Sequence, residues 1–222
     1  MIPTVPKGLF IVFEGVDGSG TTTQAKILAT ALEGRGRKVV LTREPGGTPV
    51  AEQIRQLVLD PALRDMKYRT ELLLFAASRA QHVEELIAPS LAAGKVVICD
   101  RFTASTLAYQ AYGRGLDTDL AEQVNSLAVG SCKPDLTIFL SLPLEEALRR
   151  RQSRGGATDR LEDAGERLQA LVAKGYEEIA RSQPDASMVV DARPEPDVIA
   201  NRIQQSLSER WSDLYKASNT EE

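Results

Sequence analysis

With 222 residues, 42% of them hydrophobic and 26% charged, the chain is long enough to form one domain with a sizeable core, so we expect it to need no disulfide or metal for folding. Its net charge of −4 argues against a general nucleic-acid-binding or membrane-binding protein. The sequence has no run of ~20 apolar residues, no signal-peptide core near its start and no CxxC pair, and therefore predicts a cytoplasmic protein.

Short apolar runs alternate with helical patterns along the chain. Five runs are predicted to be buried strands, at residues 9–13, 39–42, 96–99, 136–140 and 188–190. The segments between and after them are predicted to be helices, at residues 22–33, 49–59, 70–88, 120–129, 144–151, 162–182 and 197–211. Thr70 is the expected N-cap of the third helix, and Pro89 is expected near its end.

Strands that are apolar throughout and separated by helices are typical of a parallel sheet with helices on both faces. The sequence therefore predicts a single α/β domain over residues 1–222 with a five-stranded parallel sheet. Polar residues follow three of the strands: residues 15–22 after the first, Arg43 after the second, and Asp100 with Arg101 after the third. Because ligands of such sheets bind beyond the carboxyl ends of the strands, we expect one active-site crevice there.

Residues 15–22 fit the phosphate-binding pattern G-x-x-x-x-G-K-[ST] except at position 21, where threonine replaces lysine. The backbone N–H groups of such a loop surround phosphates, and the following helix adds its positive end. Thr22 places a hydroxyl where Mg²⁺ is usually held. The alternative is an ordinary glycine turn, which the strand-loop-helix context disfavours. The expected ATP-binding residues are Gly15, Val16, Asp17, Gly18, Ser19, Gly20, Thr21, Thr22 and Thr23.

Two carboxylates at this edge each have two interpretations. Asp17 either caps the tight turn or faces a hydroxyl of the second substrate. Asp100 either holds a Mg²⁺-bound water or caps a segment that starts near Thr103. We favour the metal role, because Arg101 beside it offers a phosphate-binding fork.

A basic stretch at residues 149–160 contains five arginines and the pair Gly155-Gly156. Such a run is either a solvated helix face or a lid that delivers arginines to a phosphoryl group, and the upstream phosphate loop favours a lid over residues 149–162. His82 is interpreted as a surface or packing residue rather than a base.

Several segments together resemble the bacterial thymidylate kinases, over residues 8 to 210. They are residues 42–48, 74–82, 100–102 with Ser105, 108–115, and 159–162 at the end of the lid. The resemblance implies a phosphate-loop kinase fold and transfer of the γ-phosphoryl group of ATP to dTMP, giving dTDP and ADP, with Mg²⁺, in dTTP synthesis. It also implies a homodimer packed through helices.

The resemblance further implies roles for single residues. Phe75 would stack on thymine, and Arg79 would donate to a base carbonyl, although their sequence context alone indicates a core aromatic and a surface ion-pair residue. The dTMP phosphate would be bound by Arg43 and Arg101, the 3′-hydroxyl by Asp17, the rest of the nucleoside by Ser105, Tyr109 and Gln110, Mg²⁺ by Thr22 and Asp100, and the ATP phosphates by the lid residue Arg154. Arg154, Arg101 and Asp17 are then the expected catalytic residues.

Two residues depart from the family pattern. Phe102 stands where tyrosine is common, which removes one hydroxyl, and Thr21 removes a cation. Loss of one preorganised donor typically costs about 10²–10³ in rate. The chain is therefore predicted to phosphorylate dTMP more slowly than its Thr21→Lys variant, unless Arg154 or its neighbours replace the charge. An impaired nucleotide-binding protein, an engineered residue in an ordinary enzyme and a kinase for another nucleoside monophosphate are the alternatives.

Overall fold

The computed structural model describes residues 8–155, 159–161 and 165–215, and the side chain of Arg154 also lies outside the described part. The strands are β1 (Leu9–Gly15), β2 (Val39–Arg43), β3 (Val96–Asp100), β4 (Leu136–Ser141) and β5 (Ser187–Asp191). The α-helices are α1 (Thr21–Glu33), α2 (Pro49–Leu59), α3 (Tyr68–His82), α4 (Ala88–Ala92), α5 (Thr103–Thr106), α6 (Thr118–Val129), α7 (Leu144–Arg154), α8 (Glu166–Ser182), α9 (Pro196–Arg210) and α10 (Ser212–Tyr215). Two π-helical turns, η1 (Val83–Ile87) and η2 (Leu107–Gly113), and the 3₁₀ turn η4 (Pro184–Ala186) complete the described elements.

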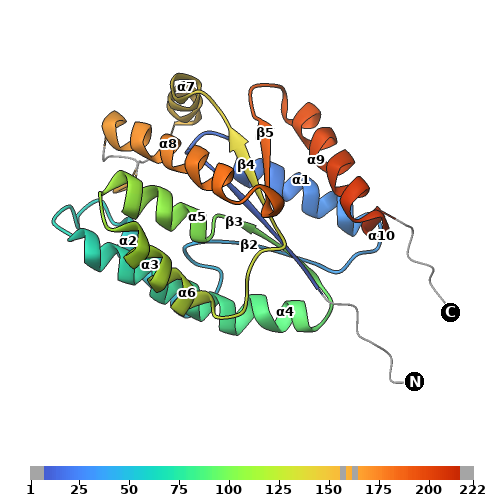
Figure 1. Ribbon diagram of the computed structural model, residues 1–222, viewed down its shortest axis with the longest axis horizontal. Coiled ribbons are helices and arrows are strands. Elements are labelled where there is room, and N and C mark those ends of the chain that lie inside the picture. Colours follow the sequence, from blue (N-terminus) through green and yellow to red (C-terminus); the bar gives the residue numbers. More distant parts are fainter. Residues whose placement is uncertain (1–7, 156–158, 162–164, 216–222) are drawn as a thin grey trace.

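The strands form one parallel sheet in the order β2-β3-β1-β4-β5, with helices on both of its faces (Figure 1). The predicted fold class is thus confirmed. Alternate residues of β1 enter two different core clusters. Ile11 and Phe13 pack in the cluster that contains Leu28 of α1, whereas Phe10 packs in the cluster that contains Ile87 of η1. Burial on both faces explains why this strand is apolar without alternation.

The helix predicted at residues 70–88 differs at both ends from the helix observed. It begins at Tyr68, so Thr70 lies inside it, and no side chain caps it at Lys67. It continues through η1 into α4 and ends at Ala92, beyond Pro89. Proline lacks an N–H group, and the wider turn of η1 directly before α4 lets the helical path continue past it.

The sequence analysis considered a helix near Thr103 only as the segment that Asp100 would cap, and it predicted none over η2. The first amides of α5 are bound by a side chain from β1, described below, so a distant residue stabilises the start of this helix. The helix expected to start at Leu144 and to run into the basic stretch is α7, which continues to Arg154 and stops at Gly155, where φ is 63°.

The sheet register places the sequence motifs at one edge. The Cα of Asp100 is paired with Phe13 on one side and with Arg43 on the other. The phosphate-binding loop starts two residues after Phe13, so the three polar segments predicted to meet do meet. No helix in the described ranges has both the length and the apolarity needed to cross a bilayer.

Candidate active site

A cavity of about 720 Å³ opens at the carboxyl edge of the sheet, within the size range of small-molecule sites. Most of the predicted site residues line it: Asp17, Gly18, Ser19, Gly20, Thr21, Thr22, Thr23, Arg43, Phe75, Arg79, Asp100, Arg101, Ser105, Tyr109 and Gln110. Gly15 and Val16 do not; they line a separate cavity of about 380 Å³ on the other side of the loop. The phosphate-facing part of the loop therefore begins at Asp17.

The loop between β1 and α1 has the backbone of an anion site. Gly18 and Gly20 have φ angles of 94° and 95°, which glycine adopts without strain. The N–H of Ser19 donates to the carbonyl of Val16 over 3.0 Å, closing the turn. Thr21 then starts α1, whose first N–H groups have no partner within the helix and carry its positive dipole. This end of α1 lies in the cavity wall, where it can bind phosphate oxygens.

Thr22 and Asp100 lie together at the base of the cavity. The Thr22 hydroxyl donates to Oδ2 of Asp100, while Oδ1 of Asp100 is buried and has no hydrogen-bond partner in the described part of the chain. A hydroxyl beside an unpartnered carboxylate oxygen is a donor set that suits Mg²⁺, which is usually bound by one or two protein oxygens together with phosphates and water. The described residues contain no cluster of three or more acidic, histidine or cysteine side chains that could hold a metal by themselves.

Glu14, which the sequence analysis missed, caps the segment that Asp100 was considered to cap. It is fully buried in β1, and its Oε1 accepts the N–H groups of Phe102 and Ser105 over 2.8 and 3.1 Å. Its Oε2 accepts the Ser105 hydroxyl over 2.6 Å. Burial raises the pKa of Glu14. The sequence did contain a signal for this role of Glu14, because a charged residue inside an otherwise apolar strand needs buried hydrogen-bond partners.

Glu14 fixes the backbone on one side of a strained residue. Arg101 has a φ of 74°, a left-handed conformation that is uncommon for a residue other than glycine. The next residue, Phe102, is bound by Glu14, and the N–H of Arg101 donates to the Phe13 carbonyl over 2.9 Å. These bonds hold Arg101 so that its side chain lines the cavity.

Asp17 is held by two side chains. Arg101 Nη2 donates to its Oδ1 over 2.8 Å, and the Tyr109 hydroxyl donates to its Oδ2 over 2.6 Å. Burial, and then the Asp17 carboxylate, raise the pKa of Tyr109 well above its ordinary value, so this phenol keeps its proton. The other Arg101 nitrogen, Nη1, donates to Tyr176 of α8 over 2.8 Å, and the sequence analysis did not single out that tyrosine.

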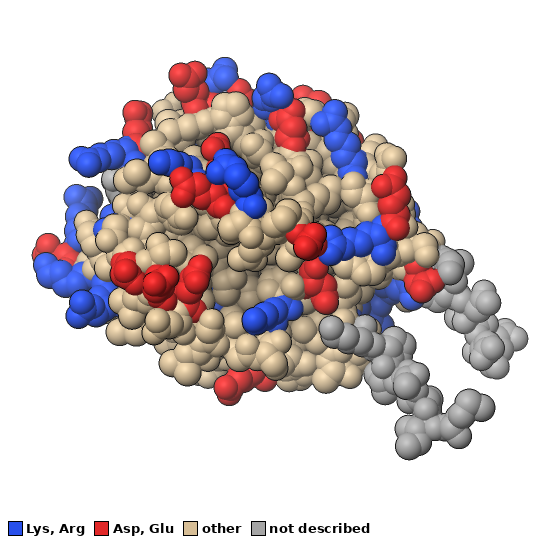
Figure 2. Space-filling view, viewed as in Figure 1, with Lys and Arg blue, Asp and Glu red and all other residues tan. Residues whose placement is uncertain are grey.

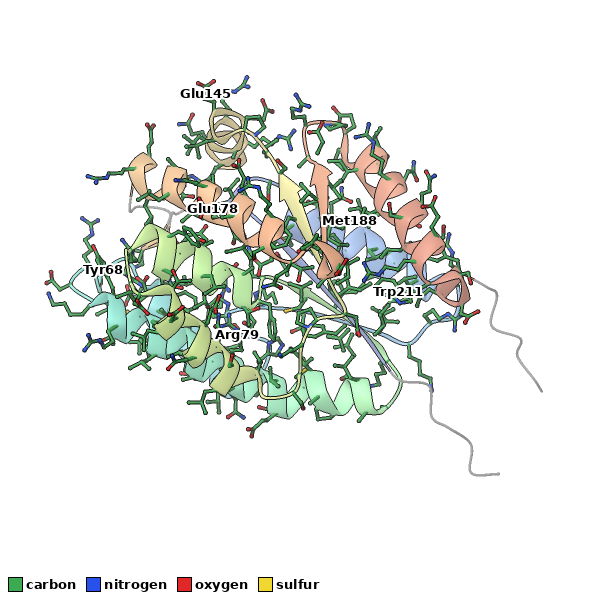
Figure 3. The ribbon with its side chains drawn as sticks, viewed as in Figure 1. Tyr68, Arg79, Glu145, Glu178, Met188 and Trp211 are labelled. Carbon is green, nitrogen blue, oxygen red and sulfur yellow. The ribbon has the colours of Figure 1, made fainter. Side chains whose placement is uncertain are left out.

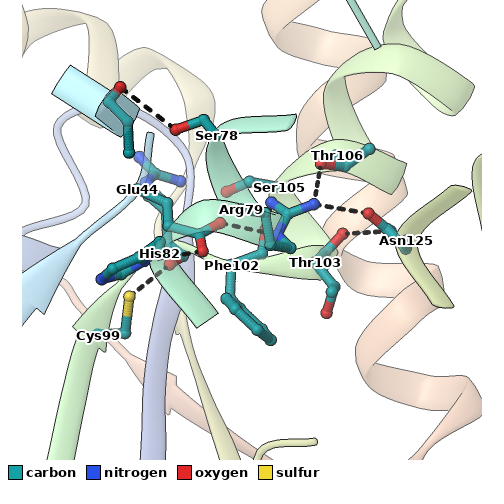
Figure 4. A network of polar contacts seen from close by, with 12 residues as sticks. Glu44, Ser78, Arg79, His82, Cys99, Phe102, Thr103, Ser105, Thr106 and Asn125 are labelled. Carbon is teal, nitrogen blue, oxygen red and sulfur yellow. Dashed lines mark hydrogen bonds and ion pairs between the residues drawn. The ribbon is translucent and has the colours of Figure 1, made fainter. Parts of the chain in front are cut away.

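Arg79 lies inside the molecule and is 1% exposed (Figure 3). Four of its five N–H donors are used in a buried network (Figure 4). Nε donates to Glu44 over 2.7 Å, Nη1 to Thr106 and Asn125 over 2.9 and 2.6 Å, and Nη2 to the Phe102 carbonyl over 2.9 Å. One Nη2 proton is left on a side chain that lines the cavity, so Arg79 can make one further contact there.

The same network contains His82. The ring is fully buried, with Nδ1 3.0 Å from Glu44 and Nε2 2.8 Å from Thr42. Of the two interpretations of His82, as a surface or a packing residue, burial excludes the first and agrees with the second, and the ring supports Arg79 through Glu44.

The remaining predicted substrate residues also line the cavity. Phe75 is 9% exposed and belongs both to the core and to the cavity wall. Gln110 donates to Glu71 over 2.8 Å, which fixes its amide. Arg43 is half exposed and forms an ion pair with Glu52 at 3.0 Å.

The predicted lid is only partly described. Arg160 does not belong to a solvated lid, because it is 6% exposed and donates to Glu71 over 2.5 Å and to the Val58 carbonyl over 3.0 Å. Residues 156–158 and 162–164 lie outside the described part, as does the side chain of Arg154. The role predicted for Arg154 stays a prediction.

Comparisons with known proteins agree with this geometry. A family model described as thymidylate kinase matches residues 13–203. A thymidylate kinase of Syntrophotalea carbinolica is 47% identical over 199 residues, covering 87% of this chain and 92% of that protein. One of Symbiobacterium thermophilum is 45% identical over 212 residues, covering 96% and 98%. The crystal structure of thymidylate kinase from Ehrlichia chaffeensis matches with a TM-score of 0.74 and 35% identity, covering 91% of this chain and 100% of that one.

Proposed function

The chain belongs to the thymidylate kinase family and phosphorylates dTMP with ATP, and from this premise we propose that the single cavity holds both nucleotides, with Mg²⁺ at Thr22 and Asp100. The observation that carries this proposal is the continuity of the cavity. It runs from the phosphate-binding loop to Phe75 and Arg79, so a γ-phosphoryl donor and a monophosphate acceptor can meet inside it.

The acceptor end of the cavity suits a thymine nucleotide. Phe75 offers an aromatic wall against which a base can stack, and Arg79 has one N–H left for a base carbonyl. Such a donor favours thymine, which presents a carbonyl, over cytosine, which presents an amino group at that edge. The rigid network around Arg79 would keep this donor in one orientation.

The phosphate of dTMP would lie between Arg43 and Arg101, which approach the cavity from β2 and from the end of β3. Asp17 would accept the 3′-hydroxyl, and its attachment to Arg101 and Tyr109 would fix that oxygen relative to the phosphate site. Positioning of this kind accounts for much of the rate enhancement in phosphoryl transfer, which needs little covalent help from the protein.

The donor end would bind ATP through the backbone of residues 17–23. N–H groups of the loop and of the start of α1 would contact the β- and γ-phosphates. Mg²⁺ would neutralise charge on the phosphates, held by the Thr22 hydroxyl and by the unpartnered oxygen of Asp100.

A coupled assay of ADP release tests these statements together. We expect ADP formation that depends on dTMP and stops when EDTA removes Mg²⁺, with weaker activity on dUMP and none on dCMP, AMP or GMP. Tight binding of ATP and dTMP by calorimetry without ADP formation would instead identify an impaired enzyme, which is the reading that Thr21 keeps open. A different preferred acceptor would overturn the assignment of the base pocket.

The proposal also covers the compartment in which the protein works, its oligomeric state and its lid. Cys99 and Cys132 are both unpaired, which supports a reducing compartment such as the cytoplasm. Leu73 of α3 and Leu127 of α6 are 53% and 87% exposed, which supports a homodimer packed through these helices. The single domain over residues 1–222 and the lid over residues 149–162 remain part of the proposal.

A further inference from the structure

Three consecutive arginines at the end of α7 have different surroundings. Arg149 is exposed and forms an ion pair with Glu146 on the same helix. Arg150 donates to the carbonyls of Ala192 and Arg193 over 2.9 and 3.0 Å, which ties α7 to the segment after β5. Arg151 lines the main cavity, and it has no hydrogen bond or ion pair within the part of the chain that the structure describes.

The start of α7 packs directly against the phosphate-binding loop. A Cβ atom placed on Gly18 would lie 2.4 Å from the carbonyl oxygen of Ala147, so only glycine permits this approach. Arg151 is four residues after Ala147 and therefore lies on the same face of the helix, one turn along. Long side chains on a helix lean back over the preceding turn, so Arg151 leans toward the turn that touches the loop.

The other arginines of the cavity already have partners. Arg43 pairs with Glu52, Arg55 donates to the Pro45 carbonyl, Arg79 is bound in its buried network, Arg101 binds Asp17 and Tyr176, and Arg150 binds backbone carbonyls. Among the described arginines that line the cavity, Arg151 is thus the one with no hydrogen bond or ion pair to any other described residue.

We propose that Arg151 supplies to the ATP phosphates the positive charge that the loop lacks because residue 21 is threonine. Thr21 is buried at the first position of α1, where its short neutral side chain offers no cation. A guanidinium from α7, on the opposite wall of the loop, reaches the same phosphates from outside and can bind two oxygens at once. This inference rests on the proposed kinase function. It assigns the missing positive charge to Arg151, about one helical turn before Arg154.

A double-mutant cycle tests the assignment. Arg151→Ala is expected to lower kcat about 10²–10³-fold in the Thr21 background, the usual loss for one preorganised donor. In a Thr21→Lys background the same change is expected to cost about 10-fold or less, because lysine then carries the charge and the two effects are not additive. Arg151→Lys keeps the charge and should retain most of the activity. Arg202→Ala is the control and should change kcat by no more than about two-fold, since Arg202 is exposed on α9 and does not line the cavity.

Two outcomes would overturn the inference. An equal loss in both backgrounds would show that Arg151 does not substitute for lysine. A background-dependent loss for Arg154→Ala, with none for Arg151→Ala, would move the role to Arg154.

Nucleotide-binding measurements distinguish a wrong assignment of Arg151 from a wrong proposed function. If Arg151 contacts the terminal phosphates, Arg151→Ala should weaken ATP more than ADP in calorimetry, whether or not the protein turns over. Equal weakening of both nucleotides, or of neither, contradicts the contact. Absence of dTMP-dependent ADP formation in the unmodified protein contradicts the proposed function alone.

Discussion

At the scale of single residues, Arg79 illustrates how this protein buries a charge, here one that we propose to contact the base. Burying an ion costs several kcal/mol unless partners compensate, and removing a partner is then expensive. Glu44, Thr106, Asn125 and the Phe102 carbonyl compensate Arg79, and they also fix the direction of its remaining N–H. Stability and the proposed base recognition would therefore depend on the same bonds.

Asn125→Ala is the mildest way to loosen this network. It removes one hydrogen bond to a charged group, of the kind that contributes about 1.5–3 kcal/mol. We expect KM for dTMP to rise about 10-fold or more, which corresponds to ~1.4 kcal/mol, with a smaller effect on kcat. Steady-state kinetics measure both, and Gln123→Ala on the exposed side of α6 is the control. An unchanged KM would show that Arg79 does not depend on Asn125 for its orientation.

Glu14 connects stability to pH. Because burial raises its pKa above the ordinary value of 4.5, the folded protein holds this proton more tightly than the unfolded chain does. The associated stabilisation is fully present below about pH 4.5 and is lost as the pH rises through the raised pKa.

Glu14→Gln keeps an oxygen that can accept the N–H groups of Phe102 and Ser105 but cannot titrate. We expect the free energy of unfolding of the natural protein, measured relative to this variant by urea titration, to fall as the pH is raised from 4.5. Parallel stability curves for the two proteins would contradict a raised pKa.

At the scale of elements, the contact between the phosphate-binding loop and α7 is decisive for the site. It brings the arginine-bearing helix to the loop, and it needs a glycine at position 18. Position 20 offers a comparison, because Gly20 has nearly the same positive φ but a Cβ there would meet nothing within 4 Å.

Alanine substitutions at these two positions therefore separate backbone strain from packing. Gly20→Ala should cost about 1–2 kcal/mol, which is the strain of a left-handed alanine. Gly18→Ala should cost about 1–3 kcal/mol more, because its Cβ overlaps a backbone oxygen of α7. Thermal unfolding measures the difference, at roughly 2–4 °C per kcal/mol for a chain of this size. Equal losses would mean that α7 moves away from the loop at no cost.

At the scale of the whole molecule, charged side chains are spread over the surface (Figure 2), whereas exposed leucines occur on the neighbouring helices α3 and α6. Lys, Arg, Asp and Glu side chains are interspersed over the face shown in Figure 2. The most exposed large apolar side chain among the described residues, Leu127, lies on α6, which packs beside α3 (Figure 1). Leu73 of α3 adds to this surface. A helix pair with exposed leucines is the surface that the proposed homodimer would bury.

Leu127→Asp tests the homodimer. A charge in the middle of such an interface should convert a dimer into a monomer, as measured by size-exclusion chromatography with light scattering. Val189→Asp, on the edge strand β5, is the control, because Val189 is also exposed, at 61%, and β5 lies away from α3 and α6 (Figure 1). A dimer that survives Leu127→Asp would contradict the proposed interface, and a monomeric parent protein would contradict the dimer itself.

Much of the fold and the phosphate-binding end of the site could be predicted from local sequence signals, whereas the nucleoside-binding residues were predicted only through the resemblance to a family. Apolar runs identified all five strands within one or two residues, and the glycine pattern located the phosphate-binding loop. The misses have a common cause. The helix from Thr103 is stabilised by Glu14 of β1, and the long helix passes Pro89 because of a π turn, so neither feature is visible in the local pattern.

Apolar periodicity was enough to predict the fold class, and glycine spacing was enough to locate the phosphate-binding loop, because both signals lie between neighbours in the chain. The family and most of the cavity residues came instead from the resemblance of several segments to the thymidylate kinases. Which arginines have protein partners became visible only once the elements were packed together. Arg79, Arg150 and Arg160 look equally basic in sequence, yet each is committed to partners far along the chain, whereas Arg151 faces the cavity without one among the described residues. Hydrogen-bond partners depend on the packing of distant elements, and a linear pattern does not record that packing.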